Sequence, residues 1–90
     1  MPELVGLPGI KRKVMPCKMV RNITAALTVT RRMATTAAND NGSISVWIDD
    51  AGNYRADFCR YLCTKGSGAF TSKSALRDWL RDWWPKMSAS

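Results

Sequence analysis

Few side chains in this chain could perform acid–base or nucleophilic chemistry. The sequence contains no histidine, so catalysis by an imidazole base, including a Ser-His-Asp triad, is excluded. Asp49 and Asp50 are adjacent carboxylates, but together with Gly52 they have the composition of an ordinary hairpin turn. No base is evident that would activate a cysteine as a nucleophile. We therefore expect a protein that is not an enzyme.

The three cysteines, Cys17, Cys59 and Cys63, follow no metal-binding or disulfide pattern. The chain lacks a Cys-x-x-Cys pair, and without histidine a zinc site would need carboxylates. On a strand, Cys59 and Cys63 would point to the same face but lie too far apart for a ready disulfide. The segment Lys65–Gly68 lacks the spacing of a phosphate-binding loop. We interpret the cysteines as reduced thiols of a cytoplasmic protein and expect no metal or other cofactor.

Contact with nucleic acid is a second kind of chemistry that the residue types allow. Polar, aromatic and basic side chains alternate with apolar ones along a predicted hairpin and would share one face. These candidates are Ser45, Trp47, Arg55, Tyr61 and, at the edge of the face, Lys65. Arginine and lysine bind phosphates or guanine, and aromatic rings stack on bases. If residues 22–30 or a second copy of the chain cover this face, Trp47 instead belongs to a core.

The net charge of +7 is unevenly distributed. Residues 1–40 carry seven basic and two acidic residues, whereas residues 41–90 carry seven basic and five acidic ones. A basic protein is attracted to polyanions such as nucleic acid, acidic proteins or anionic lipid. Further candidate contacts in the first part of the chain are Lys11, Arg12, Lys13, Arg31 and Arg32. No segment approaches the roughly 20 apolar residues of a membrane-spanning helix, so we expect no membrane partner.

The elements that would position these residues are concentrated in residues 41–87. Apolar and polar residues alternate over 44–49 and again over 54–59, which predicts a β-hairpin. Residues 64–68 are expected to form a flexible turn and residues 69–71 a short third strand. The apolar face of the hairpin would carry Ile44, Val46, Ile48, Tyr54, Ala56 and Phe58.

A C-terminal helix follows from the spacing i, i+3, i+4, i+7 of Leu76, Trp79, Leu80 and Trp83. Thr71 or Ser72 would cap its start, and Pro85 would end or kink it. On its polar side we expect weak surface pairs, Asp78 with Arg81 and Asp82 with Lys86. The apolar stripe must cover the hairpin, so the sequence predicts an α+β fold. It would be a small antiparallel sheet of three to four strands packed on one C-terminal helix, in the order β-β-β-α.

The first part of the chain, residues 1–40, is interpreted as a basic N-terminal arm or an extra strand with a linker, ahead of a β-β-β-α domain over residues 41–87. Alternation over residues 21–32 favours a strand, although Val20, Ile23, Ala26 and Leu27 also fit a helix. Small polar residues over 33–41 favour a linker. Met33 is a plausible natural start, in which case residues 1–32 are a disordered arm or an over-extended reading frame.

Three segments form a recognisable pattern: Gly42-Ser-Ile-Ser, Gly52-Asn-Tyr-Arg-Ala56 and Phe70-Thr-Ser-Lys-Ser-Ala-Leu-Arg-Asp-Trp79. Through them, residues 42–79 resemble the AP2-type, three-stranded DNA-binding domain at the N-terminus of phage and transposon tyrosine integrases. It implies that the sheet enters a DNA major groove, with Ser45, Trp47, Arg55 and Lys65 facing the duplex. The carboxylates of Asp49, Asp50 and Asp57 depart from such a surface, because phosphate repels them. No recombinase domain follows, so a stand-alone binder is expected.

The chain is also similar in pattern to small phage-encoded anti-CRISPR proteins, which implies binding to a host nucleoprotein complex. We predict a small non-enzymatic binding protein of phage or mobile-element origin, in the host cell cytoplasm, that binds nucleic acid, with duplex DNA favoured. The alternative is an inhibitor that binds a host CRISPR effector complex or its nuclease. A third interpretation is a homodimer with Trp47 at its interface.

Overall fold

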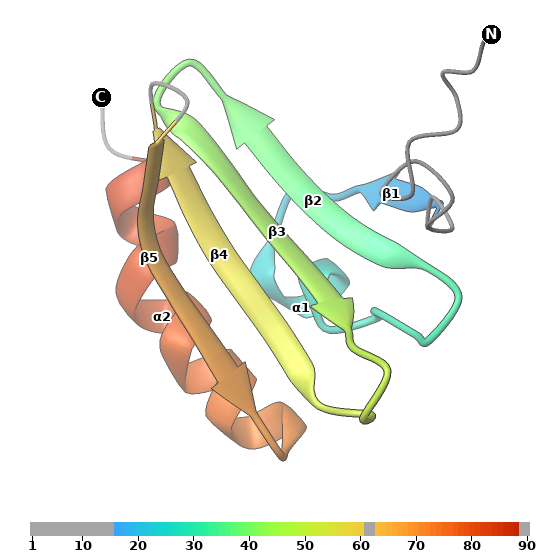
Figure 1. Ribbon diagram of the computed structural model, residues 1–90. Coiled ribbons are helices and arrows are strands. Elements are labelled where there is room, and N and C mark those ends of the chain that lie inside the picture. Colours follow the sequence, from blue (N-terminus) through green and yellow to red (C-terminus); the bar gives the residue numbers. More distant parts are fainter. Residues whose placement is uncertain (1–15, 61–62, 89–90) are drawn as a thin grey trace, which may run out of the picture.

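The computed structural model describes residues 16–60 and 63–88, which form one five-stranded sheet with two helices on the same face (Figure 1). Neighbouring strands pair antiparallel except for the first two, which pair parallel. The α+β class is confirmed, with five strands in place of three or four. In chain order the elements are β1 (Cys17–Met19), α1 (Ile23–Ala26), β2 (Ala34–Asn39), β3 (Gly42–Ile48), β4 (Tyr54–Arg60), β5 (Cys63–Phe70) and α2 (Lys73–Ser88).

The centre of the sheet is the predicted β3–β4 hairpin. Its register places Val46 opposite Ala56 and Trp47 opposite Arg55, so the two predicted faces are confirmed. The turn is closed by Asp49, whose Oδ1 accepts hydrogen bonds from the amides of Ala51 and Asn53 at 3.0 and 2.9 Å. Because its φ is 89°, Gly52 adopts a backbone conformation that few other residues tolerate.

The core lies between the sheet and α2. Leu76 and Leu80 are completely buried, and burial of each contributes roughly 1.5–3 kcal/mol in gross transfer free energy. Trp79 and Trp83 are only half-buried. Their rings stack with centroids 5.8 Å apart, beside Phe70 and Phe58 respectively. The tryptophans therefore cover the margin of the core toward β5, and the leucines occupy its middle.

Both ends of α2 are held by side chains. Ser72 caps the start, as predicted, because its Oγ accepts a hydrogen bond from the Ala75 amide at 3.2 Å. The helix continues past Pro85 to Ser88, so of the two expected effects of the proline, the end of the helix is wrong. Arg60 Nη2 donates to the Lys86 carbonyl at 2.9 Å. This contact satisfies a carbonyl that a helix end leaves without a partner.

Other side chains hold the same end of α2 to the sheet. The Nδ2 groups of Asn39 and Asn41 donate to the Met87 carbonyl at 3.1 and 3.0 Å. Met87 itself is buried. The sheet therefore stabilises a last helical turn that the proline would otherwise weaken.

The prediction of a flexible turn over residues 64–68 is wrong, because these residues form most of β5. A Cβ at Gly66 would lie within 3 Å of the indole of Trp83, and one at Gly68 equally close to the ring of Phe70. The two aromatic rings therefore lie directly on the glycine backbone of this edge strand. Glycine here allows close packing in a strand and does not mark a turn.

Two expectations upstream of the hairpin differ from the structure. The strand favoured over residues 21–32 is wrong, and the alternative, a helix, is found over residues 23–26 as α1. Asn22 caps its start, because its Oδ1 accepts a hydrogen bond from the Ala25 amide at 2.7 Å. Residues 34–39, expected to be part of a linker, form β2. Thr35 is completely buried there, and its Oγ1 donates to the Ala26 carbonyl at 2.9 Å. Tertiary packing therefore overrides the weak local signal of these small residues.

Candidate functional site

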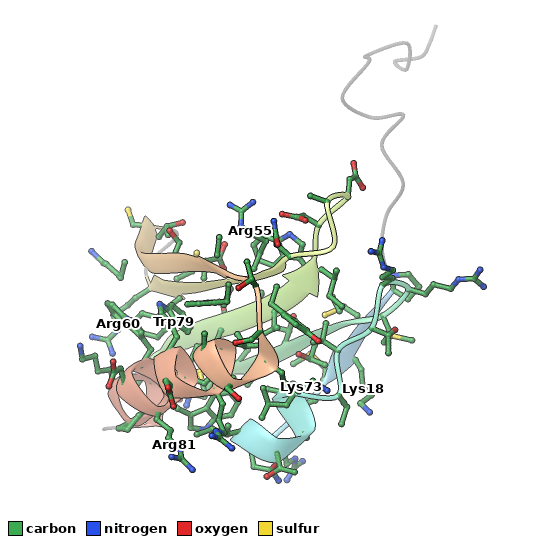
Figure 2. All side chains as sticks on the ribbon, turned by 90° about the horizontal axis from the view of Figure 1, so that it is seen from below. Lys18, Arg55, Arg60, Lys73, Trp79 and Arg81 are labelled. Carbon is green, nitrogen blue, oxygen red and sulfur yellow. The ribbon has the colours of Figure 1, made fainter. Side chains whose placement is uncertain are left out.

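One face of the sheet carries no helix from the described part of the chain. It presents alternate residues of the strands, and we call it the open face. Figure 2 shows Arg55 on this side of the sheet, whereas Trp79 lies between the sheet and α2. Residues 22–30 do not cover it, because α1 packs on the side where Thr35 and α2 lie. Its side chains include Thr36, Ser43, Ser45, Trp47, Arg55, Asp57, Cys59 and Ser67.

Trp47 and Arg55 form the most distinctive pair on the open face. They are directly opposite each other on β3 and β4, and the guanidinium carbon lies 6.0 Å from the centroid of the indole ring. Arg55 Nη1 lies 3.5 Å from Asp49 Oδ2, and the Arg55 side chain is 43% exposed. Arg55 Nε is buried and makes no hydrogen bond within the described residues. The pair thus offers a broad ring and a positioned guanidinium to a ligand.

Asp49 serves both the turn and the arginine. The amide of Asn53 and, after it, the amide of Ala51 and the Arg55 guanidinium lower the pKa of this carboxyl below 3.8, against a smaller opposing effect of desolvation. The carboxylate is therefore charged at neutral pH and partly neutralises Arg55. The Asp49 carboxylate fixes the direction of the Arg55 guanidinium, but it also weakens the attraction of this guanidinium for phosphate.

The basic turn of Arg31 and Arg32 lies at the same end of the sheet. Thr30 and Met33 exchange backbone hydrogen bonds of 2.9 and 3.2 Å, so both arginines stand at the tip of a tight turn and are exposed. A Cβ at Gly52 would lie 2.6 Å from Arg31 Nη2. The Arg31 guanidinium therefore lies against the β3–β4 turn. The fold brings this turn close to Trp47 and Arg55, which are separated from it by 15 or more residues of sequence.

A polar row crosses the open face next to this pair. Cys17 Sγ lies 2.7 Å from Thr36 Oγ1, which in turn lies 3.3 Å from Ser45 Oγ. Asp57 follows in register beside Ser45. Desolvation raises the pKa of the Asp57 carboxyl above 3.8, and the positive charge of Arg55 offsets part of this effect. The middle of the open face is therefore rich in hydroxyls and carries a negative charge.

The other residues predicted to contact nucleic acid do not join the Trp47–Arg55 pair. Lys65 is exposed on β5, at the irregularity in its pairing with β4. Tyr61 and residues 11–13 lie outside the described residues. In residues 16–60 and 63–88, no three histidine, cysteine or acidic side chains come together as metal ligands. The three cysteines are free.

The weak surface pairs expected on the polar side of α2, Asp78 with Arg81 and Asp82 with Lys86, are absent. Within the described part of the chain, Arg55–Asp49 is the single salt bridge. Lys73, Arg77 and Arg81 are exposed along α2. Their spacing of four residues was the signal that could have identified them as one surface.

Comparison with protein-family models, with curated proteins and with solved structures finds no match for this chain. No helix in the described part of the chain is long and apolar enough to cross a membrane.

Proposed function

We propose that this protein is a small, non-enzymatic binder of nucleic acid, with duplex DNA favoured, and that it uses the open face of its sheet. The observation that carries the proposal is the Trp47–Arg55 pair on a face that no described helix covers. The turn of Arg31 and Arg32 supports it, because it adds two exposed positive charges at the same end. An origin in a phage or mobile element belongs to the same proposal.

The division of charge on this surface suits groove binding. Phosphate groups line the rims of a groove, and base edges form its floor. Arg31, Arg32 and Lys65 lie at the margins of the sheet, where they would bind phosphates. Asp57 lies within the open face. Its carboxylate would repel phosphate but could accept a hydrogen bond from the exocyclic amine of cytosine.

Arg55 would read a base and Trp47 would pack against it. Asp49 holds the Arg55 side chain at 3.5 Å, so its remaining donors are oriented before the ligand arrives. A guanidinium in a fixed orientation can form the bidentate contact with guanine that is worth about 1–3 kcal/mol of discrimination. Trp47 adds apolar contact area that does not depend on salt.

Fluorescence anisotropy with a labelled duplex, at about 50 to 200 mM salt, tests the proposal. The double variant Arg31→Gln/Arg32→Gln should reduce the slope of log K against log salt by about 0.9 for each phosphate contact that is lost. Trp47→Ala should weaken binding at every salt concentration and leave the slope unchanged. If both variants bind like the wild type while their melting temperatures are unaltered, the open face does not bind DNA.

An inhibitor of a host CRISPR effector complex is the second candidate. It is favoured by the balance of charge on the open face, where Asp49 and Asp57 offset Arg55 and Lys65. Such a surface is also complementary to a protein surface that carries charges of both signs. Absence of any duplex binding at about 50 mM salt, together with co-purification of the chain with a purified effector complex, would favour this candidate.

A further inference from the structure

We propose that α2 carries a second surface for the phosphate backbone of nucleic acid, formed by Lys73, Arg77 and Arg81, which we call the basic flank. Its Arg81 lies on the opposite side of the molecule from Arg55 (Figure 2). A protein with two such surfaces can hold two nucleic-acid segments together. This inference rests on the proposed function, because it takes nucleic acid as the ligand.

The rotation of α2 is fixed by its aromatic contacts, and this places the basic flank. The Trp79 ring lies 6.3 Å from Phe70, so that side of the helix faces β5. Each helical residue turns about 100°, which sets Arg77 and Arg81, two residues before and after Trp79, on the far side. Figure 2 shows Arg81 directed away from the sheet and Arg55 on the other side of it.

The three positive charges of the basic flank form an even row. Lys73, Arg77 and Arg81 follow each other every four residues and are all exposed. Four residues of α-helix rise about 6 Å, so the row extends over about 12 Å. Duplex DNA carries one charge per about 3.4 Å along each strand. A regular row of one sign matches a regular polyanion, which is why we favour a phosphate backbone over an acidic protein.

The charges of this row are not neutralised within the described part of the chain. Asp78 and Asp82 each follow one of the arginines directly, so they lie about 100° further around the helix. Neither forms an ion pair with Arg77, Arg81 or Lys86, since the salt bridge of the described residues is Arg55–Asp49. The helix surface is therefore divided into a basic and an acidic stripe, and a polyanion can approach only over the basic one.

Two opposite surfaces predict a bridging activity. A straight duplex seated on the open face cannot reach the basic flank, because the sheet and α2 lie between them (Figure 2). The flank is then available to a second segment. Electrostatic contacts of this kind are independent of sequence and sensitive to salt. The bridging should therefore not depend on the sequence of the second duplex. As the salt concentration is raised, it should be lost before the binding of a single duplex.

The test is capture of a fluorescent duplex on beads that carry an unlabelled duplex, at about 50 mM salt. Wild-type protein should retain the fluorescent duplex. The variant Arg77→Gln/Arg81→Gln should capture about tenfold less of the fluorescent duplex. Anisotropy should still detect its binding to one duplex, and the slope of log K against log salt should fall by at most about 1.8. Unchanged capture by this variant overturns the inference.

Matched controls separate the flank from charge in general. Arg81→Gln and Lys86→Gln each remove one positive charge from α2, but Lys86 lies over the ring of Trp83 at 4.2 Å, on the opposite flank. Capture should fall for Arg81→Gln and not for Lys86→Gln; an equal fall in both overturns the inference. If Arg77→Gln/Arg81→Gln abolishes all binding while Arg31→Gln/Arg32→Gln changes nothing, the flank is the binding site and the open-face proposal fails instead. Melting temperatures exclude unfolding in each variant.

Discussion

Replacement of Gly66 by alanine should destabilise the protein, although alanine is normally the better strand residue. A Cβ at this position would lie 2.7 Å from Cη2 and 2.8 Å from Cε2 of Trp83. Carbon atoms at their best separation lie about 3.5–4.0 Å apart, so the ring would have to move by about 1 Å. It has little room, because it is enclosed by Phe58 at 5.5 Å, Trp79 at 5.8 Å and the Lys86 ammonium at 4.2 Å.

The magnitude follows from two opposing effects. Overpacking a well-filled site costs about 1–3 kcal/mol. Against this, glycine in a strand is less favourable than alanine by about 0.5–1 kcal/mol. Gly66 does not have a positive φ, so alanine introduces no backbone strain. The net loss of unfolding free energy should lie between about 0 and 2.5 kcal/mol. Each kcal/mol lowers the Tm of a domain of this size by about 4–8 °C.

Thermal unfolding followed by far-UV circular dichroism measures this loss without relying on tryptophan fluorescence. Ser67→Ala is the matched control, because Ser67 is exposed on the next position of the same strand and should leave the Tm within about 2 °C. In a Trp83→Leu background the clash disappears, so Gly66→Ala should become neutral or stabilising. A higher Tm for Gly66→Ala in the wild-type background would refute the placement of the Trp83 ring on β5.

Four further predictions follow from the core, the ionisable groups and the end of α2. Leu80→Ala should lower the unfolding free energy by about 2–5 kcal/mol in a urea titration, and by more than Trp79→Ala, because the leucine is completely buried and the tryptophan is not. The raised pKa of Asp57 means that its ionisation opposes folding, so Asp57→Asn should increase stability at pH 7, with a difference that vanishes below pH 3.8. The lowered pKa of Asp49 has the opposite sign: Asp49→Ala should decrease stability at pH 7, and this difference should shrink as acid titration protonates the wild-type carboxylate below pH 3.8. Arg60→Ala should speed amide hydrogen exchange in the last turn of α2, and Arg60→Lys should not restore protection, because lysine cannot supply both of the hydrogen bonds that the guanidinium donates.

The central hairpin and α2 were predictable because their signals are local and mutually consistent. Alternation over residues 44–49 and 54–59 and the helical spacing of Leu76 and Leu80 all indicate the same buried layer. The two faces of the hairpin follow from that alternation alone. The placement of Trp47 and Arg55 away from the helix is therefore a direct consequence of the amino-acid pattern.

The remaining strands were not predictable from local pattern. Residues 34–39 are small and polar, and they form β2 because β3 offers an edge and the core has room for Thr35. Gly66 and Gly68 have low strand propensity, yet β5 forms because Trp83 and Phe70 cover their backbone. In both cases the residues that decide the local conformation lie elsewhere in the sequence, so the segment itself favours a linker or a turn.

The distribution of charge shows the same dependence on tertiary structure and bears directly on function. By sequence alone, the excess of basic residues lies in residues 1–40. In the folded chain, however, the attraction for a polyanion depends on which cations lack an acidic partner. Arg55, which the alternating pattern placed on the candidate binding face, is partly neutralised by Asp49 at 3.5 Å. Arg77 and Arg81, for which the sequence suggested no role in binding, form no salt bridge with any described residue. Under the proposed function, phosphate contacts should therefore depend more on them than on Arg55, which contributes a fixed geometry instead.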